Sequence, residues 1–162
     1  MPLTIRRATA DDWPAIWRIF SAVVGAGDTY TFAPDTTEAE ARLFWMSERC
    51  ITCVAERGGV VLGTYVIRPN QPGLGAHVAN AGYMVRPDAF GGGIGTAMGS
   101  HSLAEARAAG YRSMQFNAVV STNTRAVALW ERLGFRIIGT VPEGFRHASL
   151  GYVDLLIMYR AL

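Results

Sequence analysis

The chain has 162 residues and half of them are apolar, which excludes general disorder and predicts one domain, residues 1–162, around a hydrophobic core. Fifteen basic residues, all arginine, against thirteen acidic ones give a net charge of +2, too small to indicate nucleic-acid binding. No apolar stretch reaches the length of a membrane span and Met1–Arg7 lacks a signal-peptide core, so we expect a cytoplasmic protein that binds neither nucleic acid nor membrane.

Hydrophobic periodicity and turn signals predict alternating elements in the first half of the chain. In chain order these are a strand over Thr4–Ala8, a helix from Asp11 or Asp12 stopped by Gly25–Asp28, a loop over Thr29–Thr36, a helix from Thr37 or Glu38 to Glu48, and strands over Ile51–Glu56, Val60–Arg68 and His77–Val85. Gly58-Gly59 is a hairpin turn signal between two of the strands.

The second half continues the alternation. It predicts a helix over Ile94–Ala109, a strand over Ser113–Val119, a helix over Asn123–Leu133, and strands over Phe135–Thr140 and Val153–Tyr159 separated by a loop over Pro142–Gly151. This order of strands and helices is typical of an α/β protein with a mixed sheet.

The two cysteines, Cys50 and Cys53, form a C-x-x-C. This spacing allows a redox or metal role, but a zinc site needs about four ligands, and no second pair or histidine cluster is nearby. Because free cysteine tends to be buried, we interpret both as structural thiols and expect no metal.

A run of glycines lies between the strand that ends near Val85 and the helix that begins near Ile94. It reads Phe90-Gly91-Gly92-Gly93-Ile94-Gly95-Thr96. Glycine permits positive φ, and successive N–H groups at a helix start form an anion site, although a loop that only needs to turn has the same composition. A Walker A loop is excluded because lysine is absent, and the glycine spacing does not complete a Rossmann fingerprint.

Two segments resemble the GNAT superfamily of N-acetyltransferases. The family motif Q/R-x-x-G-x-G/A is matched at Gly93 and Gly95, with Phe90 in place of Arg or Gln, after a strand end, Tyr83–Pro87, that also fits. Downstream, Asn123–Phe135 resembles N-x-x-A-x-x-L-Y-x-x-x-G-F, with Trp130 in place of the Tyr. With the opening I-R-x-A-T-x-x-D, the resemblance covers essentially the whole chain.

The resemblance implies a GNAT-like three-layer fold whose central mixed, mostly antiparallel twisted sheet is flanked by helices. It also implies that acetyl-CoA donates an acetyl group to a primary amine by direct attack in a ternary complex. The cofactor-binding residues it implies are Tyr83, Met84, Val85, Phe90, Gly91, Gly92, Gly93, Ile94, Gly95, Thr96, Asn123 and Trp130. Asn123 also fits a plain helix N-cap.

A narrower resemblance concerns three loop segments. Gly27–Tyr30, Gly144–His147 and Gly151–Asp154 are similar to the phosphinothricin and methionine sulfoximine acetyltransferases. This implies a small, amino-acid-like amine as substrate. The substrate-binding residues it implies are Asp28, Tyr30, Arg146 and His147, with Arg146 paired to a substrate carboxylate.

Catalysis in such a site needs an oxyanion donor and a route for the amine proton. A backbone N–H near Met84 or Val85 is the expected donor. Trp130 cannot titrate, so we interpret it as a packing residue and expect the thiolate to leave unprotonated. The candidate bases are Asp28, His77, Glu143 and His147; Asp28 sits in the expected substrate loop and is equally well a turn residue.

Two other functions remain open from the sequence. Because Phe90 and Trp130 depart from the family pattern, an idle CoA-binding or regulatory module is one alternative. Acetylation of protein N-termini or lysines is the other, although aromatic residues over Tyr30–Phe32 suit a closed small-molecule pocket better. Similar proteins commonly oligomerise, so we expect a homodimer.

Overall fold

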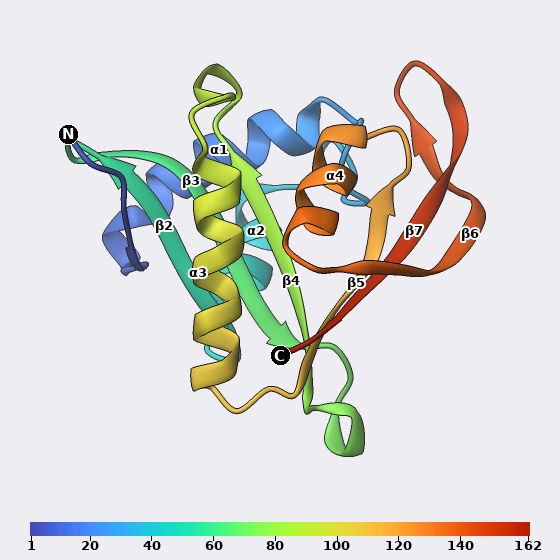
Figure 1. The fold of residues 1–162 in the computed structure, drawn as a ribbon. Helices are drawn as coiled ribbons and strands as arrows, with labels where there is room; N and C mark the ends of the chain where they lie inside the picture. The colour runs from blue at the N-terminus through green and yellow to red at the C-terminus, as the bar shows by residue number, and fades with distance from the viewer.

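The computed structural model describes all 162 residues, and its seven-stranded sheet has helices on both faces (Figure 1). The helices and strands follow in the predicted order. They are β1 Thr4–Arg7, α1 Trp13–Gly25, α2 Glu38–Trp45, β2 Ile51–Arg57, β3 Val60–Pro69, β4 Val78–Val85, α3 Ile94–Ala108, β5 Ser113–Val120, α4 Thr124–Arg132, β6 Arg136–His147 and β7 Gly151–Ala161, with short 3-10 turns at Ala10–Asp12, Gly73–Gly75 and Pro87–Ala89.

The strands lie in the order β1-β2-β3-β4-β5-β7-β6. All neighbours pair antiparallel except β4 and β5, which pair parallel. The prediction of a mixed, mostly antiparallel sheet is therefore confirmed. The single parallel junction lies near the middle of the sheet, where the connection from β4 to β5 runs through the glycine-rich turn and α3.

Two hydrophobic cores cover opposite faces of the sheet. Successive side chains of a strand point to opposite faces, and on β3 Val66 joins the core beneath α1 and α2, whereas Ile67 joins the core beneath α3 and α4. Phe20 and Trp45 are fully buried in the first core, and Met98 in the second. These two cores produce the three-layer arrangement that the family resemblance implies.

Helix α2 ends earlier than predicted. It begins with a capping box between Thr37 and Glu40, as its sequence indicates, but it stops at Trp45 instead of Glu48. The hydroxyl of Thr52 on β2 donates to the carbonyl of Trp45 (2.6 Å). A contact with the next strand of the chain, seven residues further on, therefore satisfies a carbonyl of the last turn, and the helix periodicity does not indicate this contact.

Strand β6 corrects the predicted loop over Pro142–Gly151, because it continues as far as His147. The pairing with β7 shifts register between Val141 and Phe145, so the proline lies in a bulge on an edge strand, where its missing N–H costs no ladder bond. Glu143 in this bulge has a φ of +51°, and its N–H donates to the carboxylate of Asp154 (2.9 Å).

The cysteines lie apart from the parallel junction. Cys53 is buried in the sheet and Cys50 is half-buried, and both are free thiols. Burial raises the pKa of both thiols, so neither is activated as a nucleophile. None of the helices combines the length and apolar character that a bilayer span requires.

Candidate active site

The glycine-rich turn reaches α3 through two left-handed residues. Gly91 and Gly93 have φ of +89° and +73°, and Gly93 caps the helix. A Cβ added at either position would meet no atom within 4 Å, so the backbone conformation, not crowding, requires glycine. The first N–H groups of a helix have no partner within it, and Ile94–Thr96 line a cavity at this positive end of the helix dipole.

Strands β4 and β5 form a fork. They pair only at Val78–Ser113 and Ala79–Met114 and then separate towards α4 (Figure 1). A cavity of about 710 Å³ fills the fork and reaches the loop between α1 and α2. Its volume and largely apolar lining are those of a small-molecule site.

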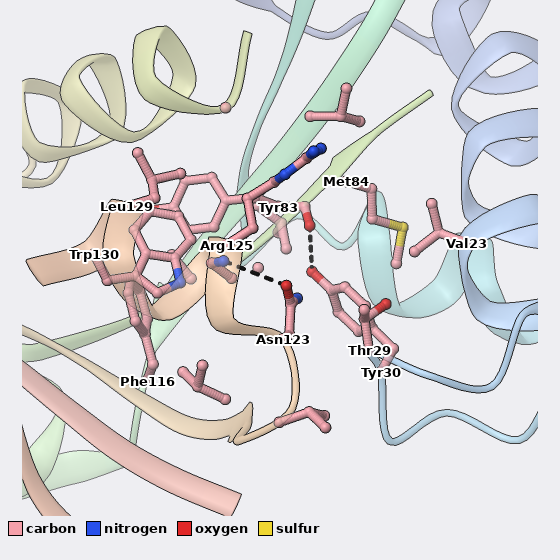
Figure 2. A pocket seen from close by; sticks show the side chains of 18 of the residues that line it. Val23, Thr29, Tyr30, Tyr83, Met84, Phe116, Asn123, Arg125, Leu129 and Trp130 are labelled. Atoms are coloured by element: carbon pink, nitrogen blue, oxygen red, sulfur yellow. Dashed lines mark hydrogen bonds between the residues drawn. The ribbon is translucent and has the colours of Figure 1, made fainter. Parts of the chain in front are cut away.

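Six residues of the second family segment line this cavity, and Asn123 and Trp130 are two of them (Figure 2). The side-chain oxygen of Asn123 accepts the N–H of Ala126 (3.3 Å) and caps α4, which leaves its amide nitrogen free. Trp130 is buried, with its ring centroid 4.6 Å from Tyr83 and 4.7 Å from Phe116. This placement agrees with the interpretation of Trp130 as a packing residue.

The backbone of β4 directs alternate N–H groups to opposite sides. The N–H of Arg86 donates to the carbonyl of Leu62 (2.8 Å), and the β3–β4 register is unbroken along β4. Since every second residue repeats the direction, the N–H of Met84 faces β3 like that of Arg86. The N–H groups of Tyr83 and Val85 face the fork. The expected donor at Met84 is therefore corrected, because its N–H belongs to the sheet.

An aromatic wall, formed by Tyr30, Phe32, Phe44 and Trp45, closes the cavity on the side of α1 and α2. Neighbouring ring centroids in it lie 4.9 to 6.4 Å apart. The Tyr30 hydroxyl donates to the backbone carbonyl of Tyr83 (2.8 Å; Figure 2). Burial raises the pKa of Tyr30 well above its ordinary value, so the hydroxyl stays protonated and fixes the wall against β4.

The charged side chains that line the cavity are three arginines, Arg68, Arg125 and Arg132, and none of its lining residues is an aspartate, glutamate or histidine. Arg125, in the first turn of α4, has its guanidinium carbon 5.5 Å from the centroid of the Phe90 ring. A cation from α4 therefore lies beside the glycine-rich turn, next to Phe90, the position at which the family motif usually has Arg or Gln.

Most of the predicted cofactor residues line the cavity, and Gly92 alone among them does not. Of the predicted substrate residues, only Tyr30 lines it. Asp28 and Arg146 are exposed outside the lining. The Nδ1 atom of His147 accepts the N–H groups of Ser149 and Leu150 at 3.1 and 3.2 Å, so this side chain caps the turn between β6 and β7.

The four candidate bases are not brought into the cavity. Asp28 and His147 lie outside its lining. His77 is exposed just before β4, at the closed end of the fork, and Glu143 lies in the exposed bulge of β6. No acidic or histidine side chain is therefore positioned to take the proton of a bound amine directly.

Sequence reasoning missed several residues of the site. Arg68 on β3, Asn80 on β4 and Asn117 on β5 line the cavity, as do the wall residues Phe44 and Trp45. Arg68 and Asn80 are direct cross-strand partners, so alternation within two correctly predicted strands, with the register known, would have found them on one face.

Comparisons with known proteins agree with this geometry. A solved GCN5-related N-acetyltransferase from Kribbella flavida is 48% identical, with a TM-score of 0.95 over 99% of this chain and 98% of that one. The yncA protein of Salmonella typhimurium, solved with acetyl-CoA, is 26% identical, with a TM-score of 0.88 over 100% of this chain and 95% of that one.

A curated relative has a named substrate. The L-methionine sulfoximine/L-methionine sulfone acetyltransferase of Pseudomonas aeruginosa is 30% identical over 150 residues, which are 88% of this chain and 86% of that protein. The model of the Acetyltransferase (GNAT) family matches residues 13–135, which include the fork, the glycine-rich turn and α4. The chain therefore belongs to the GNAT acetyltransferase family.

Proposed function

We propose that the chain transfers the acetyl group of acetyl-CoA to the primary amine of a small, amino-acid-like molecule held in a ternary complex. The observation that carries this proposal is the continuity of the cavity. It runs from the left-handed glycines at the start of α3, past the fork-facing N–H groups of Tyr83 and Val85, to the aromatic wall.

The glycine-rich turn fits the pyrophosphate of the cofactor, because it combines free N–H groups with a helix N-terminus. Arg125 adds a cation at the same place. The fork offers the pantetheine arm the Asn123 amide and the N–H of Val85. Among the fork-facing donors Tyr83 lies closest to the wall, since its carbonyl accepts the Tyr30 hydroxyl, so we assign its N–H to the thioester oxygen.

In this arrangement the amine approaches from the side of the aromatic wall. Its lone pair forms the new N–C bond while the N–H of Tyr83 stabilises the charge that develops on the carbonyl oxygen. The C–S bond breaks with its electron pair on sulfur, which takes a proton from solvent because Trp130 has no acidic proton to give. The amine proton passes to water, since no acidic or histidine side chain lines the cavity.

The named relative supports the choice of substrate class. It acts on methionine sulfoximine and methionine sulfone, two amino acids of a size that a cavity of about 710 Å³ accommodates beside the cofactor arm. The aromatic wall also encloses the cavity on the side of α1 and α2, which suits a small molecule better than an extended chain. Both observations favour a small molecule over a protein substrate.

We also propose a homodimer. The edge strand β6 exposes Ile137, Ile138 and Val141 to 44%, 51% and 41% of their surface, an apolar strip that a second copy would cover. Size-exclusion chromatography with light scattering is expected to give twice the chain mass for the wild type and the mass of one chain for Ile138→Arg. A monomeric wild type would contradict the proposal.

The direct test of function is thiol release from acetyl-CoA in the presence of a panel of amines. The panel contains apolar amino acids, methionine sulfone and methionine sulfoximine, polyamines, and short peptides with free N-termini or lysines. We expect turnover with amino acids and little with peptides. Tight acetyl-CoA binding without turnover of any amine would support an idle module, and preference for peptides would support protein acetylation.

A further inference from the structure

One charged side chain lies at the acceptor end of the cavity, which we define as the part enclosed by the aromatic wall and β3. Arg68 lines it from β3, opposite Asn80 of β4 in the register and on the same face of the sheet. Its guanidinium carbon is 3.8 Å from the centroid of the Phe44 ring. The planar guanidinium is thus held over an aromatic face, which orients it without using its N–H donors.

These donors have no partner in the protein. The four ion pairs of the structure involve Arg6, Arg7 and Arg86, and the Arg68 side chain makes no hydrogen bond to another residue. The titratable groups that its charge reaches are Tyr30 and Cys50, which are both neutral when protonated. Burial lowers the pKa of Arg68, so this cation is partly desolvated and not neutralised by any carboxylate.

The neighbouring amides do not compete with Arg68 for an anion. Asn80 donates to the carbonyl of Gln115 (3.0 Å), and Asn117 donates to the side-chain oxygen of Asn70 (2.6 Å). The side-chain oxygen of Asn117 is in turn occupied by Gln115 (3.0 Å). The groups that remain unoccupied are the N–H donors of the Arg68 guanidinium and, opposite it, the side-chain oxygen of Asn80.

We propose that Arg68 binds a carboxylate of the acceptor and thereby makes the enzyme selective for amines that carry one. The inference rests on the proposed function. Arg68 and the reaction centre are joined by the aromatic wall, because Arg68 stacks on Phe44, the Phe44 ring neighbours Trp45 (6.4 Å) and the Trp45 ring neighbours Tyr30 (6.4 Å). The Tyr30 hydroxyl in turn donates to the carbonyl of Tyr83 beside the proposed reaction centre. The wall then holds the apolar side chain of the same amino acid.

The test uses matched acceptors. One set is L-methionine sulfone, its primary amide and 3-(methylsulfonyl)propylamine, and the other is L-leucine, its primary amide and isoamylamine. Charge-assisted hydrogen bonds contribute roughly 1.5–3 kcal/mol, which corresponds to about 10- to 100-fold. We expect kcat/KM of the wild type for the acid to exceed that for both forms that lack the carboxylate by about this factor.

The Arg68→Gln variant is expected to lose about 10- to 100-fold in kcat/KM for the acid, through KM, and less than about 3-fold for the decarboxylated amine. Arg68→Lys keeps the charge without the planar fork and should give an intermediate ratio. Arg49→Gln is the matched control, since Arg49 is exposed and lines a neighbouring groove that Arg68 also borders. Thermal midpoints and acetyl-CoA affinity should be unchanged in all three variants.

Two results would overturn the inference. Equal kcat/KM of the wild type for acid and decarboxylated amine is one, and an equal loss for every acceptor in Arg68→Gln, as expected of a purely structural role, is the other. If the wild type turns over no amine, the proposed function fails by itself. Calorimetry of methionine sulfone and leucine binding to wild type and Arg68→Gln then decides, since binding that depends on Arg68 supports the inference and its absence contradicts it.

Discussion

The two ends of the cavity are built in different ways. The cofactor end consists of the glycine-rich turn, the start of α3 and the residues Asn123–Trp130, which are two continuous segments that offer mostly backbone groups. The acceptor end brings single side chains together from four separate segments: the loop before α2, the end of α2, β3 and β4. A site made of backbone in a required conformation leaves a motif in the sequence. A site made of side chains that meet only after folding leaves none.

The largest expected effect tests the cofactor end. Gly93→Val places a β-branched residue at a φ of +73°, a conformation that costs such a residue about 2 kcal/mol. We expect the affinity for acetyl-CoA to fall by about 30-fold, the equivalent of this cost, as measured by KM and calorimetry. The acceptor KM should stay constant. Gly110→Val is the control, because Gly110 has a φ of +87° at the other end of α3, away from the cavity. Equal acetyl-CoA affinities in the two variants would show that the glycine-rich turn does not bind the cofactor.

A second test asks whether the cofactor end also depends on a side chain. Arg125→Gln removes the cation beside Phe90, and loss of one phosphate contact is expected to raise the acetyl-CoA KM about 10-fold at low salt. The increase should shrink as salt screens the wild type. Arg107→Gln, at an exposed site in the last turn of α3, is the control. If the acetyl-CoA KM changes neither with salt nor in Arg125→Gln, the cofactor end binds through backbone groups alone.

A smaller effect is expected from the contact that joins the two ends. Tyr30→Phe removes the hydrogen bond to the carbonyl of Tyr83, worth about 1 kcal/mol, so we expect about a 5-fold lower kcat/KM for the acceptor. The melting temperature should fall by a few degrees. Tyr152→Phe, at a residue that is 65% exposed, should change neither. Unaltered acceptor kinetics in Tyr30→Phe would mean that the wall does not position the amine.

The smallest contribution is expected from titration of the enzyme itself. Burial raises the pKa of Tyr30 and Tyr83. Both phenols therefore stay neutral as pH rises through the ordinary range of phenol titration, and their ionisation causes no loss of activity. With no acidic or histidine side chain in the cavity, kcat/KM should rise with pH until the acceptor amine has lost its proton.

The midpoint of this rise should move with the amine pKa when the acceptor is exchanged. A midpoint near neutral pH that stays fixed for all acceptors would instead reveal an enzymic base at the acceptor end.

The sequence predicts the fold well because its signals are local. The capping residue Thr37, the left-handed glycines and the N-cap Asn123 each act within one turn of their own position. They establish the elements, their order and the cofactor end. The predicted boundary failed where a residue of the next element intervenes, as at Trp45, whose carbonyl accepts the hydroxyl of Thr52 on β2.

The acceptor end was not predictable to the same extent. Arg68 and Asn80 meet because of the β3–β4 register, and Asn117 faces the cavity because the fork opens after only two paired residues. Asp28 and His147 were expected in the site because they stand in segments similar to related enzymes, but the fold leaves one exposed and uses the other to cap a turn. Sequence proximity to a motif does not determine where a side chain points.

The close contact of α3 with α4 has an evolutionary consequence. A Cβ at Gly99 would lie 2.5 Å from Leu133 and 3.2 Å from Trp130, so the three positions share one volume. A side chain at position 99 therefore requires the Leu133 methyl group to turn away or Leu133 to be replaced by a smaller residue. A change from Trp130 to the smaller tyrosine is compatible with Gly99, whereas an enlargement of Gly99 is limited first by Leu133 and only then by Trp130.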